Sequence, residues 1–128
     1  MLQAPDGRSI NTVAAIVDGY SRERYLDSAP WIIEALAKLG VGVELFRLTD
    51  SRMPMRLLGF SPDVVWPMSL GAYAEDGKLQ GFLETLLPGT PYVGSGVAAS
   101  AMGLDKEYTQ DACRVLGLSV PESACLET

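Results

Sequence analysis

The stretch from Thr12 to Val17 reads TVAAIV, and Asp18-Gly19 follows it directly. A continuous apolar run that meets a turn is typical of a strand buried on both faces, as in a parallel sheet. Residues 28–40 begin with a serine cap and a proline and end at a glycine, which predicts a helix. Residues 41–48 form a second apolar strand. Two strands joined through a helix make a βαβ unit, so the two strands are expected to be parallel.

The alternation of strands and helices continues along the chain. A short strand is expected over residues 63–66, a helix over 76–87 and a fourth short strand over 91–93. Residues 51–60 stay open between a short helix and a packed loop, because Pro54 interrupts them. The pattern predicts an α/β fold, a Rossmann-like parallel sheet of about four strands flanked by helices on both faces.

Two helices close the predicted fold, over residues 97–103 and from 105 to the glycine at 117. The apolar positions of the first helix fall on one face: Ala29, Ile32, Ile33, Leu36 and Leu39. Those of the last helix are expected to turn inward: Tyr108, Ala112, Val115 and Leu116. We expect one domain over residues 1–121. Residues 122–128 would then be the start of a further region or a tail.

Composition excludes several classes of protein. The chain has 128 residues, 48% of them hydrophobic and 20% charged, which is enough for one packed core. A net charge of −6 opposes nucleic-acid binding, and no apolar run is long enough to cross a membrane. We expect a cytoplasmic protein. Cys113 and Cys125 form no CxxC pair, and the absence of histidine leaves little support for a metal site.

Ligands of open α/β sheets bind outside the carboxyl ends of the strands, which singles out three loops, residues 18–24, 67–73 and 94–96. Glu23 could pair with the ammonium group of an amino acid, or be an ordinary surface charge. Gly94-Ser95-Gly96 could bind an anion at a helix start, or simply form a tight turn. Lys106 could reach a phosphate, or be solvated. Glu75-Asp76 is explained without catalysis, with Asp76 as a helix cap and Glu75 in the helix dipole.

Three stretches together resemble the N-terminal domain of the D-alanine–D-alanine ligase family, within the ATP-grasp superfamily. They are DGYSRER from Asp18, EDGKLQGFLETL from Glu75, and TPYVGSGVAASAMGLDKEYTQ from Thr90. The resemblance covers roughly residues 12–126. It implies an enzyme of peptidoglycan biosynthesis in which ATP and Mg²⁺ activate the carboxylate of one D-alanine as an acyl phosphate, and the amine of a second D-alanine attacks it.

The resemblance also implies roles for individual residues. Gly19, Ser21 and Glu23 match a Gly-x-Ser-x-Glu loop that holds the ammonium group of the first amino acid. Lys106 matches a lysine that lies near the nucleotide. Leu70 stands where the family usually has histidine, which puts specificity for D-alanine in doubt. The family commonly forms dimers, so a homodimer is implied as well.

The ATP-grasp lobes that supply most nucleotide contacts and the magnesium ligands in the family have no counterpart in the 128 residues. We therefore expect no complete reaction from this chain alone and no tight ATP binding. The lobes would have to be supplied in cis or in trans. Two rivals remain open: a stand-alone, non-catalytic module that binds a small amino acid or a protein, and a flavodoxin-like domain that binds a phosphate-containing ligand.

Overall fold

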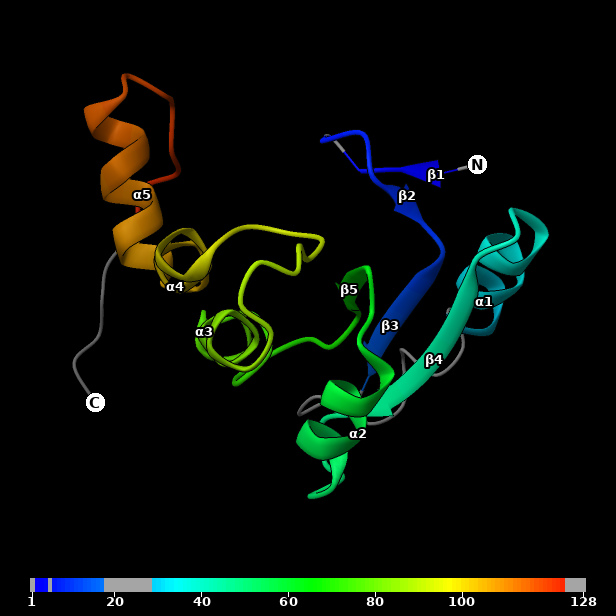
Figure 1. Ribbon diagram of the computed structural model, residues 1–128. Helices are drawn as coiled ribbons and strands as arrows, with labels where there is room; N and C mark the ends of the chain where they lie inside the picture. The colour runs from blue at the N-terminus through cyan, green and yellow to red at the C-terminus, as the bar shows by residue number, and fades with distance from the viewer. Residues whose placement is uncertain (1, 5, 18–28, 124–128) are drawn as a thin grey trace.

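The computed structural model describes residues 2–4, 6–17 and 29–123 (Figure 1). In this part of the chain, five strands and five helices follow the order β1, β2, β3, α1, β4, α2, β5, α3, α4, α5. The strands are β1 Leu2–Gln3, β2 Ser9–Ile10, β3 Thr12–Val17, β4 Gly42–Arg47 and β5 Val64–Pro67. The helices are α1 Ala29–Lys38, α2 Met53–Phe60, α3 Lys78–Leu86, α4 Val97–Leu104 and α5 Lys106–Val115.

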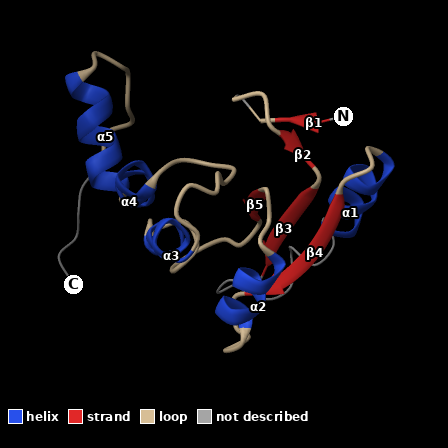
Figure 2. Cartoon of the chain, viewed as in Figure 1, coloured by secondary structure: helices blue, strands red, loops and turns tan. Residues whose placement is uncertain are grey.

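The main sheet has the order β4-β3-β5, and both of its strand pairs are parallel (Figure 2). Alternate residues of β3 point to opposite faces, as a strand requires. Ala14 and Ile16 pack with residues of α2 and α3, whereas Ala15 and Val17 pack with Ala29 of α1. The predicted α/β fold with helices on both faces of a parallel sheet is confirmed, and β3 has the predicted bounds.

The sheet has three strands where about four were predicted. The expected fourth strand, residues 91–93, forms only an isolated parallel bridge between Val65 and Tyr92. The Val65 N–H donates to the Pro91 carbonyl at 3.0 Å, and the Val93 N–H donates to the Val65 carbonyl at 2.9 Å. Pro91 has no N–H to extend the ladder, and Gly94 turns the chain away at φ +126°.

Residues 51–60, left open by the sequence, contain helix α2. Pro54 lies in its first turn, where a missing N–H costs nothing. Ser61 ends the helix in a left-handed conformation, and its N–H donates to the Leu57 carbonyl at 3.1 Å. The hairpin of β1 and β2 was not predicted at all. The predicted cap at Ser28 lies outside the described residues.

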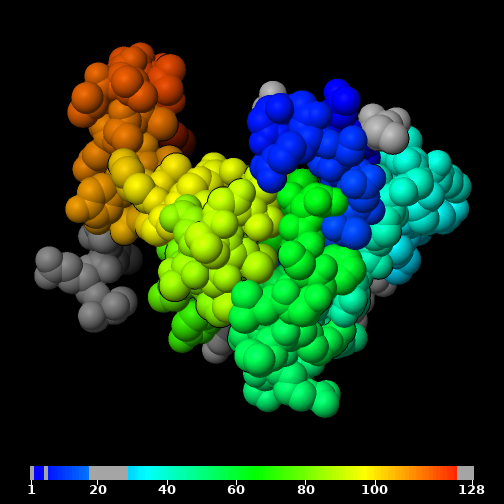
Figure 3. Space-filling view, in the orientation of Figure 1, coloured from blue at the N-terminus to red at the C-terminus, as the bar shows by residue number. Residues whose placement is uncertain are grey.

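The prediction that α5 turns its apolar face inward is wrong. Tyr108 is 65% exposed, Val115 88% and Leu116 74%. α5 packs chiefly on α4, and in Figure 3 it stands away from the body of the molecule. Leu39, which was predicted to share one apolar face with Leu36, is 58% exposed just after the end of α1. Helical spacing identifies an apolar face but does not say what covers it.

Candidate functional site

A cavity of about 460 Å³ lies at the carboxyl end of β5. The segment after β5 forms one wall, and the Val93–Ser95 turn together with α4 forms another. Lys106, the first residue of α5, lies at its edge. The residues that line the cavity are Pro67, Ser69, Leu70, Ala74, Glu75, Gln80, Val93, Gly94, Ser95, Ala99, Ser100, Gly103, Leu104 and Lys106.

Two of the three predicted ligand loops, residues 67–73 and 94–96, therefore meet at one cavity, and Lys106 joins them. Parallel strands place their carboxyl ends at the same edge of a sheet, which is why loops distant in sequence converge. The third loop contains Gly19, Ser21 and Glu23 and lies outside the described residues. Their predicted role in holding an ammonium group stays a prediction.

Two buried polar side chains belong to this cavity. Ser69 is 4% exposed, and its Oγ donates to the Ile16 carbonyl at 3.2 Å, which ties the segment after β5 to the end of β3. Gln80 is 6% exposed, and its Nε2 donates to the Ala74 carbonyl at 3.1 Å. The sequence did not single out Gln80. The pattern that could have identified it is a polar residue between Leu79 and Leu83, which are both buried on the core side of α3.

Two carboxylates hold the turn that leads into α3. Glu75 Oε2 accepts the Gly71 N–H at 2.7 Å. Asp76 Oδ2 accepts the Tyr73 N–H at 3.0 Å, and its Oδ1 accepts the Lys78 N–H at 3.1 Å. Gly77, rather than Asp76, occupies the N-cap position. Glu75 thus fastens a loop, an interaction that the predicted dipole role did not include.

The electrostatics of Asp76 follow from these contacts. The ammonium group of Lys78 is its strongest partner, and the two backbone N–H groups add to the effect. Together they lower the pKa of Asp76 to about 2. The same Lys78 Nζ lies 4.8 Å from the centre of the Tyr73 ring. The carboxylate is therefore ionised throughout the neutral range.

Lys106 is exposed, and no described residue forms a hydrogen bond or ion pair with its ammonium group. It begins α5 directly after Asp105, whose carboxylate caps that helix by accepting the N–H groups of Glu107 and Tyr108 at 3.0 and 3.1 Å. Helix α4 begins after Gly96 without a side-chain cap. An uncapped helix start and a cation beside one cavity suit a phosphate group.

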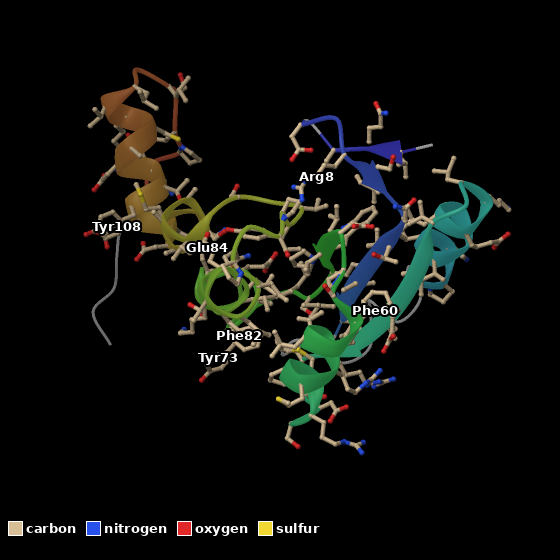
Figure 4. The ribbon with its side chains drawn as sticks, viewed as in Figure 1. Arg8, Phe60, Tyr73, Phe82, Glu84 and Tyr108 are labelled. Atoms are coloured by element: carbon tan, nitrogen blue, oxygen red, sulfur yellow. The ribbon has the colours of Figure 1, made fainter. Side chains whose placement is uncertain are left out.

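Among the residues that the structure describes, no group of three or more Cys, Asp or Glu side chains could hold a metal ion. Over the same residues, no helix is long and apolar enough to cross a membrane. A second cavity, of about 310 Å³, lies between the start of α2 and α3. Its lining is mostly apolar and includes Met53, Tyr73 and Phe82; Figure 4 labels the last two.

Comparison with known proteins gives a consistent relationship. No protein-family model matches the chain. The chain is 39% identical to a D-alanine–D-alanine ligase of Neisseria meningitidis over 122 residues, which are 93% of this chain and 39% of that protein. It is 44% identical to a D-alanine–D-alanine ligase of Mycobacterium bovis over 98 residues, which are 70% of this chain and 26% of that protein.

Solved structures agree with the sequence relatives. The D-alanine–D-alanine ligase of Bacillus anthracis, in its complex with ATP, superposes with a TM-score of 0.71 and 27% identity over 89% of this chain and 39% of that one. The chain thus spans well under half the length of these relatives. Sequence and fold together show that the chain belongs with the D-alanine–D-alanine ligase family, as a counterpart of its N-terminal domain.

Proposed function

We propose that this chain is the substrate-side domain of an ATP-dependent carboxylate–amine ligase that joins small amino acids such as D-alanine. The observation that carries the proposal is the cavity at the carboxyl end of β5. There the loop after β5, the start of α4 and Lys106 meet in a chain related to D-alanine–D-alanine ligases. The domain division at residue 121 is part of the same proposal.

Separate groups would serve the amino acid and the nucleotide. Glu23, in one loop with Gly19 and Ser21, would pair with the ammonium group of the amino acid. Lys106 would neutralise a phosphate of ATP, because its ammonium group has no partner among the described residues and lines the cavity. Bound ATP supplies the phosphoryl group that activates the carboxylate. No described cluster suits Mg²⁺, which the ATP-grasp lobes would have to hold.

The exposed apolar face of α5 supports the need for further lobes. Val115 and Leu116 follow Tyr108 on one side of the helix, and all three are more than half exposed. Large apolar side chains gathered on one face mark a surface that another part of a protein covers. We propose that the ATP-grasp lobes, in cis or in trans, complete the enzyme, and that the chain alone is inactive.

The test is reconstitution. The 128-residue chain is mixed with the ATP-grasp lobes of a relative, ATP, Mg²⁺ and D-alanine, and release of phosphate is measured. Activity should appear only in the mixture. Glu23→Gln should raise the KM for the amino acid, and Lys106→Met should raise the KM for ATP, each about tenfold or more. Lys38→Met serves as the control, because Lys38 pairs with Glu34 on α1.

Each part of the proposal has an outcome that would reject it. If a mixture with correctly folded lobes released no phosphate, the hypothesis that the lobes complete the enzyme in trans would be wrong. Binding of D-alanine with unchanged affinity in Glu23→Gln would remove that residue's role. If the chain bound D-alanine without any response to the lobes or to ATP, the stand-alone binding module would be the better description.

A further inference from the structure

The loop from Ser69 to Asp76 has an unusual backbone. Gly71 has φ +82° and Tyr73 has φ +72°, so two left-handed residues lie within three positions. A tyrosine rarely adopts this conformation, and such residues persist only where their surroundings enforce them. The loop follows β5 and supplies Ser69, Leu70 and Ala74 to the wall of the cavity. Its conformation therefore sets the shape of that wall.

Side chains hold this loop from several directions. Ser69 Oγ anchors its start on the Ile16 carbonyl at 3.2 Å. Glu75 Oε2 takes up the Gly71 N–H at 2.7 Å, across the middle of the loop. Gln80 lies on α3, and its Nε2 donates a hydrogen bond to the Ala74 carbonyl at 3.1 Å. One of these contacts ties the loop to β3, one lies within the loop and one comes from α3, and together they restrict its conformation.

Gln80 contributes less to stability than a purely structural contact would be expected to. Its Oε1 is buried and has no hydrogen-bond partner among the described residues. The amide cannot be turned over, because Oε1 would then face the Ala74 carbonyl and two acceptors would meet. A buried acceptor without a partner lowers stability. An apolar side chain of similar length would remove this acceptor but would leave the Ala74 carbonyl without its donor, so the two side chains should differ little in stability. Stability of the core therefore does not account for this glutamine.

We propose that Glu75 and Gln80 are positioning residues of the amino-acid site. They fix the loop so that Ser69, Leu70 and Ala74 present a preformed wall to the bound amino acid, and neither needs to touch the reacting atoms. A loop held in advance spares the ordering cost that binding would otherwise carry. This inference rests on the proposed function, because it takes a small amino acid as the ligand.

The test is a titration of the full 128-residue chain with D-alanine. Binding is measured through the NMR chemical shifts of the backbone amides, at a temperature well below the melting temperature. Glu75→Ala should raise the Kd about tenfold and speed hydrogen exchange at Gly71. Glu75→Gln should stay within about threefold of the wild-type affinity, because its amide oxygen still accepts the Gly71 N–H. Glu34→Ala, which removes the same charge from α1, should change neither quantity.

Gln80→Met separates positioning from stability. Methionine fills the same space without an amide. It removes the unpartnered Oε1 but also the donor to the Ala74 carbonyl, so the melting temperature should change little while the Kd for D-alanine increases about tenfold. A merely structural glutamine would show the reverse, a lower melting temperature with unchanged affinity. That result, or equal affinities for Glu75→Ala and wild type, would overturn the inference.

Failure of the proposed function looks different. If the wild-type chain showed no shift changes with D-alanine either alone or mixed with the ATP-grasp lobes and ATP, the amino-acid assignment itself would fall, and the positioning roles with it. If the wild type responded and Glu75→Ala and Gln80→Met responded equally well, only the positioning roles would fall. Parallel titrations with glycine and L-alanine show whether the cavity wall discriminates by the size of the amino-acid side chain or by the configuration at its Cα atom.

Discussion

At the scale of single residues, Gly77 decides how closely α3 approaches α4. It has φ +86°, and a Cβ atom there would lie 2.6 Å from the Val97 carbonyl oxygen. We predict that Gly77→Ala lowers the free energy of unfolding by about 1–3 kcal/mol, through backbone strain and this contact. Denaturant unfolding measures it. The control is Gly59→Ala in α2, where an added Cβ would have no neighbour within 4 Å beyond the adjacent residues and the backbone of the helix itself. This substitution should be neutral or slightly stabilising.

Asp76 provides a prediction on pH. Its pKa in the folded chain is about 2, against an ordinary value of 3.8, so the folded state favours the ionised carboxylate. Its contribution to stability is fully present above the ordinary value and is lost as the pH falls through about 2. A carboxyl-detected NMR titration should show this midpoint. Lys78→Met, which removes the largest cause, should raise it, and a wild-type midpoint near 4 would contradict the contacts described.

At the scale of elements, α5 depends on its own cap more than on the core. Asp105→Ala removes the acceptor for the Glu107 and Tyr108 N–H groups and should destabilise the helix by about 1 kcal/mol. Because α5 packs chiefly on α4, hydrogen exchange should increase within α5 and stay unchanged in β3. Asp111→Ala is the control, since its exposed pair with Arg114 contributes little. Faster exchange in β3 would show that α5 belongs to the core unit.

At the scale of the whole molecule, the exposed apolar face of α5 should govern self-association. We predict that the chain associates as its concentration rises, and that Val115→Lys shifts the equilibrium toward the monomer. Val115 is 88% exposed, so the substitution should leave the fold intact. Analytical ultracentrifugation measures the effect. Glu107→Lys, which adds positive charge at the start of the same helix, should leave association unchanged if apolar contact, rather than charge, drives it.

Much of the fold could be predicted from the sequence, because its signals are local. The apolar run of β3 and the spacing of Leu79, Leu83 and Leu87 depend on strand and helix periodicity alone, and both elements formed as expected. The βαβ rule then made β3 and β4 parallel. The fourth strand is reduced to a bridge between Pro91, which has no N–H to donate, and Gly94, which turns the chain away.

The candidate site was predictable only in part. Carboxyl-end loops and Lys106 could be named in advance, because topology alone places ligands at that edge of the sheet. Gln80 could not, since its importance comes from Ala74 and from a buried oxygen without a partner. The sequence accounts for Glu75 only through its charge in the helix dipole, and its hydrogen bond from the Gly71 N–H is seen only in the structure.

Sequence alone was enough to infer the order of strands and helices, the parallel sheet and the family resemblance, because these depend on neighbours along the chain. Tertiary structure alone decided which polar side chains meet at the cavity and which apolar face stays uncovered. The Ser69 bond to Ile16 spans 53 positions, a closeness that no local pattern encodes. Burial likewise depends on what packs against a side chain, so equal helical patterns ended inside the core in α3 and in solvent in α5.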